Sequence, residues 1–304
     1  MSIRFQDIGQ RLKAFRIGAG LSADELAKQI GISRAALYRY EKGEVAKVDT
    51  LERISDVLGV SVPNLLGVGM EYVPSAIGFF ERMRQIEADA ERIIVLFGPV
   101  SYLLTSDAFD ETLRVVLKEG IPEQVDNRTQ ALAAVDELME ILLARKRQYR
   151  ERRPAVVSLI SGAEFERFLR NGLVGTLDMD PETRYRRRVM ALREADHIVH
   201  LMEEQPIGVQ IGVVLDTMPN TSFQIFGQTD RALLAISPFR LGEQPNIRVG
   251  VALITAAPEA IDLHQRIADD LWSRALKGPE AARYLRGLID RCGVREETLS
   301  ERTA

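Results

Sequence analysis

The sequence predicts two structural units, a small all-α domain of five short helices followed by a larger α+β domain. Three observations support this prediction: short amphipathic segments with capping residues before residue 68, long segments of helical periodicity after residue 107, and alternating apolar segments between residues 207 and 253. A chain of 304 residues has the length of about two average domains. We expect domains at residues 1–68 and 92–304, with a linker or connecting helix at residues 69–91.

Composition narrows the class of protein further. The chain is 46% hydrophobic and 28% charged, as in ordinary globular proteins. Its single cysteine, Cys292, excludes an intrachain disulfide and a cysteine-rich zinc module. The first residues are polar rather than signal-like, and the longest apolar run, residues 93–104, is interrupted and too short to cross a bilayer. We therefore expect a soluble cytoplasmic protein without a membrane partner.

The charge is distributed unevenly along the chain. The first 68 residues contain ten basic and eight acidic side chains, a formal charge of +2, whereas the net charge of the whole chain is −4. The remaining residues therefore carry −6. A mildly basic N-terminal segment followed by an acidic remainder is typical of a small nucleic-acid-binding domain joined to another domain.

The first three helices are predicted by periodicity and by their caps. A first helix has apolar residues at spacings of three and four, namely Phe5, Ile8, Leu12 and Phe15. Ser22 and Glu25 form a capping box at the start of a second helix, which Gly31 ends. Ser33 caps a third helix. Because only about three residues separate the second and third helices, they form a helix-turn-helix arrangement.

Two further short helices complete the predicted domain. Asp49 or Thr50 begins a fourth helix, which carries Leu51, Ile54, Val57 and Leu58 on one face. A fifth helix starts at Ser61 and Pro63.

Residues 20–43, GLSADELAKQIGISRAALYRYEKG, resemble the helix-turn-helix of the XRE family, relatives of lambda repressor and Cro. The resemblance covers about residues 8–66. Positions in family register are Leu26-Ala27, Gly31, Ser33, Arg39 and Glu41-Lys42-Gly43. It implies a domain that binds DNA through its third helix. Ala23 stands where the family commonly has a glutamine that contacts a phosphate, so backbone contacts would depend more on Ser33 and Lys42.

The resemblance and the chemistry of the side chains give the same roles to the third helix, whose N-terminal part would enter the major groove. The candidate DNA-binding residues are Ser33, Arg34, Ala35, Ala36, Tyr38, Arg39 and Lys42. Arg34 or Arg39 could bind the O6 and N7 atoms of guanine, and the alanine methyl groups suit contact with thymine. Ser33 and Lys42 would hold phosphates. The alternative is a helical module that binds only protein.

The rest of the chain predicts an α+β domain in which helices precede and follow a cluster of largely antiparallel strands. Expected helices are 107–119, 128–152, 162–171, 181–204, 258–277 and 279–290, and expected strands are 93–97, 155–160, 207–215, 223–226, 232–236 and 247–253.

We expect that the protein is not an enzyme and binds no cofactor. The sequence has no Gly-x-Ser-x-Gly nucleophile motif and no glycine-rich nucleotide loop after a strand. It also lacks the Ala-Gly pair of a self-cleaving repressor in residues 67–92. Glu194, His197 and His200 share a helix face with Glu204 one turn further, which suits a metal ion. We favour the other interpretation, in which the histidines bond to their neighbours and no metal is bound.

Two runs of basic residues have open interpretations. The first is Arg145, Lys146 and Arg147 with Arg150, Arg152 and Arg153; the second is Arg184 with Arg186, Arg187 and Arg188. We interpret the first run as a solvated face that complements the dipole at a helix end. The second run lies near a helix start, where this argument fails, so it favours an anion or an acidic partner surface.

The leading hypothesis is a dimeric, sequence-specific transcriptional repressor that binds a double-stranded operator. Its second domain would form the homodimer and bind a small-molecule effector. One face of helix 128–152, carrying Leu132, Val135, Leu138, Met139, Leu142 and Leu143, is a candidate dimer contact, or alternatively core. Phe223, Phe226 and Arg240 are the candidate effector pocket. The alternatives are a DNA-targeted enzyme of unrecognised chemistry and an antitoxin-like protein whose second domain binds a partner protein.

Overall fold

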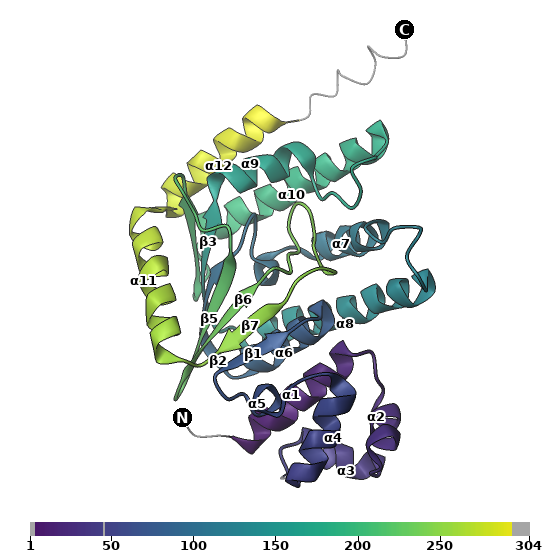
Figure 1. The fold of residues 1–304 in the computed structure, drawn as a ribbon. Helices are drawn as coiled ribbons and strands as arrows, with labels where there is room; N and C mark the ends of the chain where they lie inside the picture. Colours follow the sequence, from purple (N-terminus) through teal and green to yellow (C-terminus); the bar gives the residue numbers. More distant parts are fainter. Residues whose placement is uncertain (1–3, 45, 294–304) are drawn as a thin grey trace.

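The computed structural model describes residues 4–44 and 46–293, and Ser22, Ser33 and Ser61 cap three of its N-terminal helices. The five helices are α1 (Phe5–Gly18), α2 (Ala23–Ile30), α3 (Arg34–Glu41), α4 (Val48–Leu58) and α5 (Val62–Leu66). The side chain of Ser22 accepts a hydrogen bond from the backbone N–H of Glu25, whose carboxylate accepts one from the Ser22 N–H, so the predicted capping box is confirmed. These helices form the group at the bottom of Figure 1.

The body contains a mixed sheet with the strand order β1-β7-β6-β5-β2-β3-β4-β8. Its strands are β1 (Met70–Val73), β2 (Ala90–Leu96), β3 (Ala155–Ser161), β4 (Val209–Val214), β5 (Ser222–Gln228), β6 (Ala232–Ser237), β7 (Ala252–Thr255) and β8 (Leu276–Lys277). The prediction of largely antiparallel strands is wrong for the centre, because β3 runs parallel to both β2 and β4. Helical crossovers link these three strands, and such connections return the chain to the same end of the sheet.

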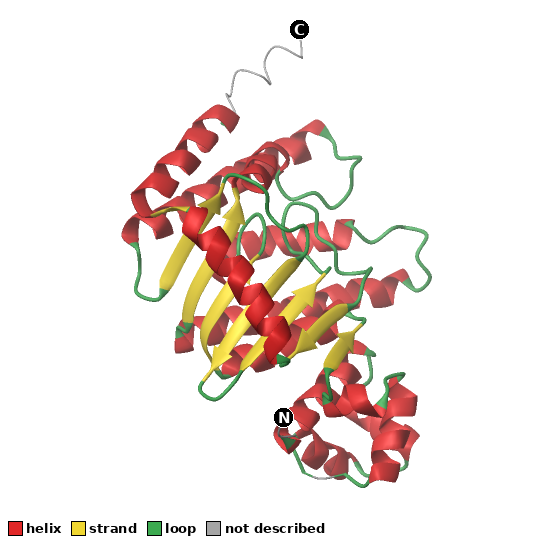
Figure 2. Ribbon diagram, turned by 60° about the vertical axis from the view of Figure 1, so that its left-hand side comes forward, coloured by secondary structure: helices red, strands yellow, loops and turns green. Residues whose placement is uncertain are grey.

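Helices cover both faces of this sheet. They are α6 (Ala76–Ala88), the short 3₁₀ helix η1 (Tyr102–Leu104), α7 (Asp107–Glu119), α8 (Arg128–Arg152), α9 (Gly162–Asn171), α10 (Pro181–Glu204), α11 (Pro258–Arg274) and α12 (Gly278–Cys292). Helix α11 crosses one face, and the other body helices lie behind the sheet (Figure 2). The α+β class is therefore confirmed. None of the helices within the described ranges is both long and apolar enough to cross a membrane.

The segment 69–91 differs from the expected linker. It contains the edge strand β1, which pairs with β7, as well as the expected helix, α6. The apolar side chains Phe79, Phe80, Met83 and Ile86 of α6 are all buried. Because β1 has only four residues, it shows too little alternation to be recognised from the sequence. The segment is thus an integral part of the body.

The strand predicted at residues 247–253 is wrong in most of its length. The strand β7 begins only at Ala252, and the side chains of Val249 and Val251 are exposed. The side chain of Asn246 accepts hydrogen bonds from the backbone N–H groups of Arg248 and Val249. This local bonding folds the segment as a turn, although its apolar residues alternate.

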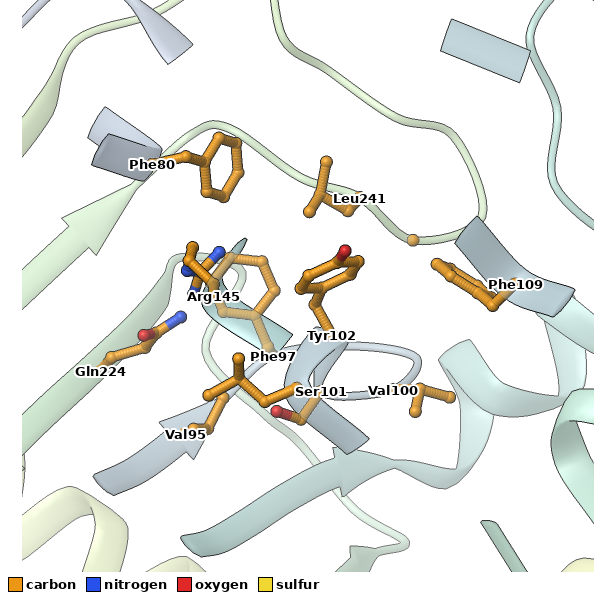
Figure 3. Close-up of a pocket in the computed structure, with 12 residues that line it drawn as sticks. Phe80, Val95, Phe97, Val100, Ser101, Tyr102, Phe109, Arg145, Gln224 and Leu241 are labelled. Carbon is orange, nitrogen blue, oxygen red and sulfur yellow. The ribbon is translucent and has the colours of Figure 1, made fainter. Parts of the chain in front are cut away.

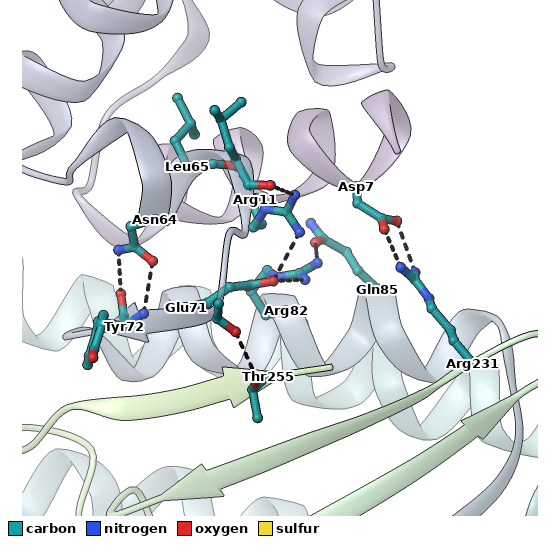
Figure 4. Close-up of polar contacts among 12 residues, drawn as sticks. Asp7, Arg11, Asn64, Leu65, Glu71, Tyr72, Arg82, Gln85, Arg231 and Thr255 are labelled. Atoms are coloured by element: carbon teal, nitrogen blue, oxygen red, sulfur yellow. Dashed lines mark hydrogen bonds and ion pairs between the residues drawn. The ribbon is translucent and has the colours of Figure 1, made fainter. Parts of the chain in front are cut away.

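A residue of the helical domain covers the outer edge of β1. The side-chain oxygen of Asn64, on α5, accepts from the Tyr72 N–H at 2.9 Å, and the Asn64 amide donates to the Tyr72 carbonyl at 3.1 Å (Figure 4). The amide thereby pairs with the strand as a neighbouring backbone would. This contact protects a sheet edge that could otherwise pair with another chain.

A buried ionic cluster joins the two domains. The Glu71 carboxylate, on β1, accepts from Arg11 of α1 at 3.1 Å and from two nitrogens of Arg82, on α6, at 3.0 Å each (Figure 4). Arg11 also donates to the carbonyl groups of Leu65 and Leu66. All three charged side chains are at least 92% buried. The cluster therefore fixes α1, β1 and α6 together.

A second ion pair spans the same junction. Arg231, which follows the turn after β5, donates to both carboxylate oxygens of Asp7 on α1. Burial raises the pKa of Asp7, but the hydrogen bond and charge of Arg231 outweigh it, so this pKa lies below its ordinary value. The Asp7 contact therefore stabilises the junction above the ordinary carboxyl pKa and is lost as the pH falls through the lowered one.

Replacing Glu71 by glutamine should lower the free energy of unfolding by about 3–5 kcal/mol, because two buried guanidinium groups lose their shared carboxylate. Chemical denaturation of the full chain measures this loss. The control is Glu140→Gln, whose side chain is 69% exposed, and which should change stability by no more than about 0.5 kcal/mol. Equal effects of the two substitutions would contradict the structural role of the cluster.

Candidate nucleic-acid interface

The helices α2 and α3 form the helix-turn-helix predicted from the sequence. Gly31 ends α2 with a φ of 70°, a left-handed conformation that favours glycine. The side chain of Ser33 then accepts from the Ala36 N–H and caps α3. Leu26, Ile30 and Leu37 are at most 2% exposed and form the core that the two helices share. The turn and this core fix how α3 is presented at the surface.

Contacts with α1 hold the other side of α3. The backbones meet at Gly9, where a Cβ atom would lie 2.5 Å from the carbonyl oxygen of Tyr40. A buried ion pair joins Arg16 to Glu41, with the Arg16 Nε 2.6 Å from a carboxylate oxygen. Arg16 also donates to the Leu21 carbonyl at 2.8 Å. Glu41, which the resemblance marked by register, thus has a structural role.

The structure gathers the predicted DNA-binding residues on the outer face of α3. Ser33, Arg34, Ala35, Tyr38, Arg39 and Lys42 are exposed, and Ala36 is half-buried. Ala23, at the departure from the family pattern, is 7% exposed and belongs to the core. It therefore presents no group to a phosphate.

Two acidic residues that the sequence analysis did not single out lie beside the arginines of this face. Arg34 is 3.0 Å from the carboxylate of Asp24 and donates to the Tyr38 hydroxyl at 3.1 Å. Arg39 is 3.4 Å from the carboxylate of Glu44. Each of these four charged side chains is more than half exposed, so the ion pairs are weak and both guanidinium groups stay accessible. The acidic partners on neighbouring segments were not identifiable from the periodicity of α3 alone.

Glu194 and the histidines of α10, which the sequence offered as metal ligands, bond to their neighbours. The Glu194 carboxylate accepts from the Ser106 N–H at 2.9 Å and from its hydroxyl at 2.5 Å, at the start of α7. His197 bonds to the Leu104 carbonyl, and His200 to that of Asp196. No cluster of three or more metal-ligating side chains occurs within residues 4–44 and 46–293. These groups therefore have the structural contacts that we favoured.

The solvated face expected for the first basic run is wrong for two of its members. Arg145 and Lys146 are each 2% exposed and form buried ion pairs with Glu87 and Asp110. In the second run, Arg187 is also buried, against Glu119, whereas Arg184 and Arg186 are exposed. Because the acidic partners lie far away in the sequence, the basic runs alone could not predict these ion pairs.

The predicted effector pocket does not form. Phe223 and Phe226 lie on β5 and are buried on opposite faces of the sheet, Phe223 under α11 and Phe226 under the other helices. Residues three apart on a strand point in opposite directions, since side chains alternate with a period of two. Arg240 lies elsewhere, in an open polar hollow with Glu164, Arg167 and Glu243.

Four of the six residues on the predicted apolar face of α8 are core, whereas Leu132 and Leu143 are half-buried. Val135, Leu138, Met139 and Leu142 are completely buried within one chain. Their partners are the neighbouring helices α6 and α7. The core interpretation is therefore correct for these four residues.

Comparison with known proteins agrees with the local structure. Residues 12–65 match the helix-turn-helix family model. A protein of Pyrobaculum aerophilum, whose name proposes that it is an HTH-type transcriptional regulatory protein, is 38% identical over 55 residues. The match covers 18% of this chain and 22% of that protein. The N-terminal domain is a helix-turn-helix domain, which confirms the resemblance inferred from the sequence.

Replacing Gly9 by alanine should lower the free energy of unfolding by about 1–3 kcal/mol, because the new methyl group overlaps the backbone of α3. Thermal unfolding of the full chain measures this effect. The control is Gly287→Ala in α12, where the nearest atom to the new Cβ is Arg291 Nη1 at 3.4 Å. This change should stabilise the helix by up to about 1 kcal/mol. A stable Gly9→Ala variant would disprove the close packing of α1 on α3.

Proposed function

We propose that this protein is a sequence-specific DNA-binding transcriptional regulator. The observation that carries the proposal is the outer face of α3, where Arg34, Arg39 and Lys42 are exposed on a domain that matches the helix-turn-helix model. A guanidinium group can donate two hydrogen bonds to one guanine, and the face has two such groups. A cytoplasmic location belongs to the same proposal, because a regulator must share a compartment with its operator.

We also propose that the protein acts as a dimeric repressor. One helix-turn-helix contacts only one half-site, and two half-sites one helical turn apart increase both affinity and specificity. Repression requires only that the bound protein occupy its operator. We assign dimerisation and the response to a ligand to the body, because the apolar side of α1 is already used against α6.

We propose binding rather than catalysis for the body. Three titratable residues of α10 support this view, since Glu194, His197 and His200 bond to backbone or hydroxyl groups nearby. The alternatives, an enzyme of unrecognised chemistry or an antitoxin-like partner, would each need a feature of the body that contacts a substrate or a second protein.

Arg39→Ala should weaken binding to the specific site much more than binding to random DNA and relax the preference at one base position per half-site. A bidentate contact to guanine provides about 1–3 kcal/mol of discrimination. The operator is first selected from a random duplex library with the purified chain. Affinities of wild type and variant for the selected and scrambled duplexes then measure the change. Failure to select any sequence would refute the proposed function.

Lys42→Ala is the matched control on the same helix. A lysine that holds a phosphate contributes no sequence information, so both kinds of DNA should lose similar affinity. The dependence of log affinity on log salt should become shallower by about one per half-site. Equal losses on both duplexes for Arg39→Ala, with an unchanged base preference, would mean that α3 is oriented differently on DNA.

The full chain should sediment as a dimer of twice 34.1 kDa and bind a palindromic operator with two chains per duplex. Sedimentation velocity with and without operator measures both values. An isolated body must begin before β1, because residues 69–91 supply an edge strand and a buried helix. A monomer at all concentrations that binds one half-site would contradict the dimeric proposal.

A further inference from the structure

A cavity lies at the junction of the helical domain and the sheet. Its wall includes Asp7 and Arg11 of α1, the segment that follows α5, and residues of β1, β6 and β7. Figure 4 shows this junction, with Glu71, Arg231 and Thr255 of the body facing α1. Both domains therefore contribute to one cavity.

The volume of this junction cavity suits a small molecule. It measures about 390 Å³ among the residues that the structure describes, and small-molecule sites have volumes of about 300–1,000 Å³. The cavity behind the sheet, which Phe80, Tyr102 and Arg145 line (Figure 3), measures about 20 Å³ and has room for about one water. Of these two cavities, only the one at the junction can hold an effector.

The polar part of the wall consists of opposite charges in pairs. Its charged side chains are three arginines and three carboxylates, namely Arg4, Arg11, Arg231, Asp7, Glu71 and Asp230. Ion pairs join Arg4 to Asp230, Arg231 to Asp7 and Arg11 to Glu71. The inner pair of Arg11 and Glu71 is more than 90% buried, whereas Arg4 and Asp230 are about half exposed. A ligand can reach this outer pair from solvent, and an exposed pair is weak enough to open.

The charges of the wall determine which ligand fits. A ligand that displaces water from Arg4 and Asp230 must supply an acceptor to the guanidinium and a donor to the carboxylate, since unsatisfied polar groups are costly. A molecule with one net charge would add an unbalanced charge to a wall whose own charges cancel. Charge-assisted hydrogen bonds are stronger than neutral ones, which favours ionised groups over an uncharged amide or alcohol. A zwitterion meets all three conditions.

The rest of the wall is largely apolar. Five aliphatic side chains line it, namely Leu66, Val68, Leu233, Ile254 and Ala256. Gly67, Gly69 and Thr255 complete it, and the Thr255 hydroxyl already donates to the Gly69 carbonyl at 2.8 Å. The aliphatic part of the wall suits a hydrocarbon side chain. A free α-amino acid with an apolar side chain combines such a group with both charges of a zwitterion.

The position of the cavity couples it to the DNA-binding domain. Arg4 directly precedes α1, and Asp230 lies in the turn between β5 and β6, so their ion pair joins the helical domain to the body. The helix α1 in turn holds α3 through the buried pair of Arg16 and Glu41. A ligand that takes over the partners of Arg4 and Asp230 would therefore change the contact between the body and the support of α3.

We propose that the junction cavity binds the effector of the regulator, an α-amino acid with an apolar side chain. Its carboxylate accepts hydrogen bonds from Arg4, its ammonium group donates to Asp230, and its side chain lies against the aliphatic part of the wall. The effector role rests on the proposed function, whereas the binding itself does not.

The binding test uses L-leucine and two analogues that each lack one of its charges. The analogue 4-methylpentanoate lacks the ammonium group, and 3-methylbutylamine lacks the carboxylate. The wall is observed through methyl NMR signals of the full chain, which retains residues 1–3, and the signals are those of Leu66, Val68, Leu233 and Ile254. L-leucine should shift these signals saturably, and each analogue should bind at least about tenfold more weakly.

Two results would overturn the proposal. One is equal binding of L-leucine and either analogue, because the site would then not require both charges. The other is the absence of a saturable shift with L-leucine and also with L-methionine and L-phenylalanine, which represent the other shapes of apolar side chain.

Two double variants separate the charged contacts from general destabilisation. Arg4→Gln with Asp230→Asn removes the outer ion pair and should weaken the binding of L-leucine by about tenfold or more. Arg274→Gln with Asp216→Asn removes an ion pair of similar exposure that does not line the cavity. This control should keep wild-type binding. Exposed pairs contribute little to stability, so both variants should fold. Equal affinities in both variants would refute the assigned contacts.

A third variant fills the cavity and keeps every ion pair. Val68 lines the cavity and is 53% exposed, so a larger side chain does not disturb the core. Val68→Trp should abolish the shifts of Leu233 and Ile254 on addition of L-leucine. Unchanged shifts in this variant would place the probe elsewhere and refute the site.

The regulatory part is tested with the selected operator. A saturating concentration of the amino acid that binds should change the DNA affinity of the wild type by about fivefold or more and leave that of Val68→Trp unchanged. Binding of the amino acid without any effect on DNA affinity would refute the effector role. If the chain binds no DNA, the proposed function fails, and the NMR titration still decides whether the cavity is a binding site.

Discussion

The carboxylate of Glu71 is the point on which the arrangement of the two domains depends. It receives hydrogen bonds from Arg11 of the helical domain and from Arg82 of the body, with all three side chains buried. Two buried cations that share one anion are stable only while each donor is satisfied, so neither arginine can move away at low cost. The position of α1 relative to the sheet follows from this constraint.

Helix α6 links the Glu71 cluster to the helices of the body. On one side its residue Arg82 binds Glu71, and on the other its residue Glu87 binds Arg145 of α8. The helix is buried along most of its length, which leaves it little freedom to move without a change in its neighbours. A helix-turn-helix attached to such a helix is oriented by the body rather than free on a tether. The contacts through which the body can act on the helical domain include those of α6, those of β1 with Arg11 and Asn64, and that of Arg231 with Asp7.

The outer face of α3 combines a rigidly held backbone with weakly paired side chains. The buried pair between Arg16 and Glu41 and the contact at Gly9 fix α3 from behind. In contrast, Arg34 and Arg39 are paired with Asp24 and Glu44 only at the surface. Exposed ion pairs contribute little free energy. The arginines can therefore exchange these carboxylates for another hydrogen-bond acceptor while the helix keeps its position.

The sequence alone determined the elements whose signals are local. Periodicity and caps predicted the helices at residues 107–119, 128–152, 162–171 and 181–204, and the structure has the same limits. They also predicted the helix-turn-helix and the exposed face of α3, because a cap or an amphipathic face involves residues only a few positions apart. The opposite directions of Phe223 and Phe226 were also determined locally, by the alternation of side chains along a strand. The predicted pocket was inconsistent with this alternation.

Only the tertiary structure decided the features that join distant residues. Those were the parallel pairing of β2, β3 and β4, the edge strand β1, and the acidic partners of Arg145 and Lys146. A run of basic residues has the same sequence pattern whether its side chains are solvated or paired with carboxylates of another helix. The partner of Arg145 lies 58 positions away and that of Lys146 lies 36 positions away. The physical reason is that burial and charge pairing depend on which elements pack together, and no local pattern records that.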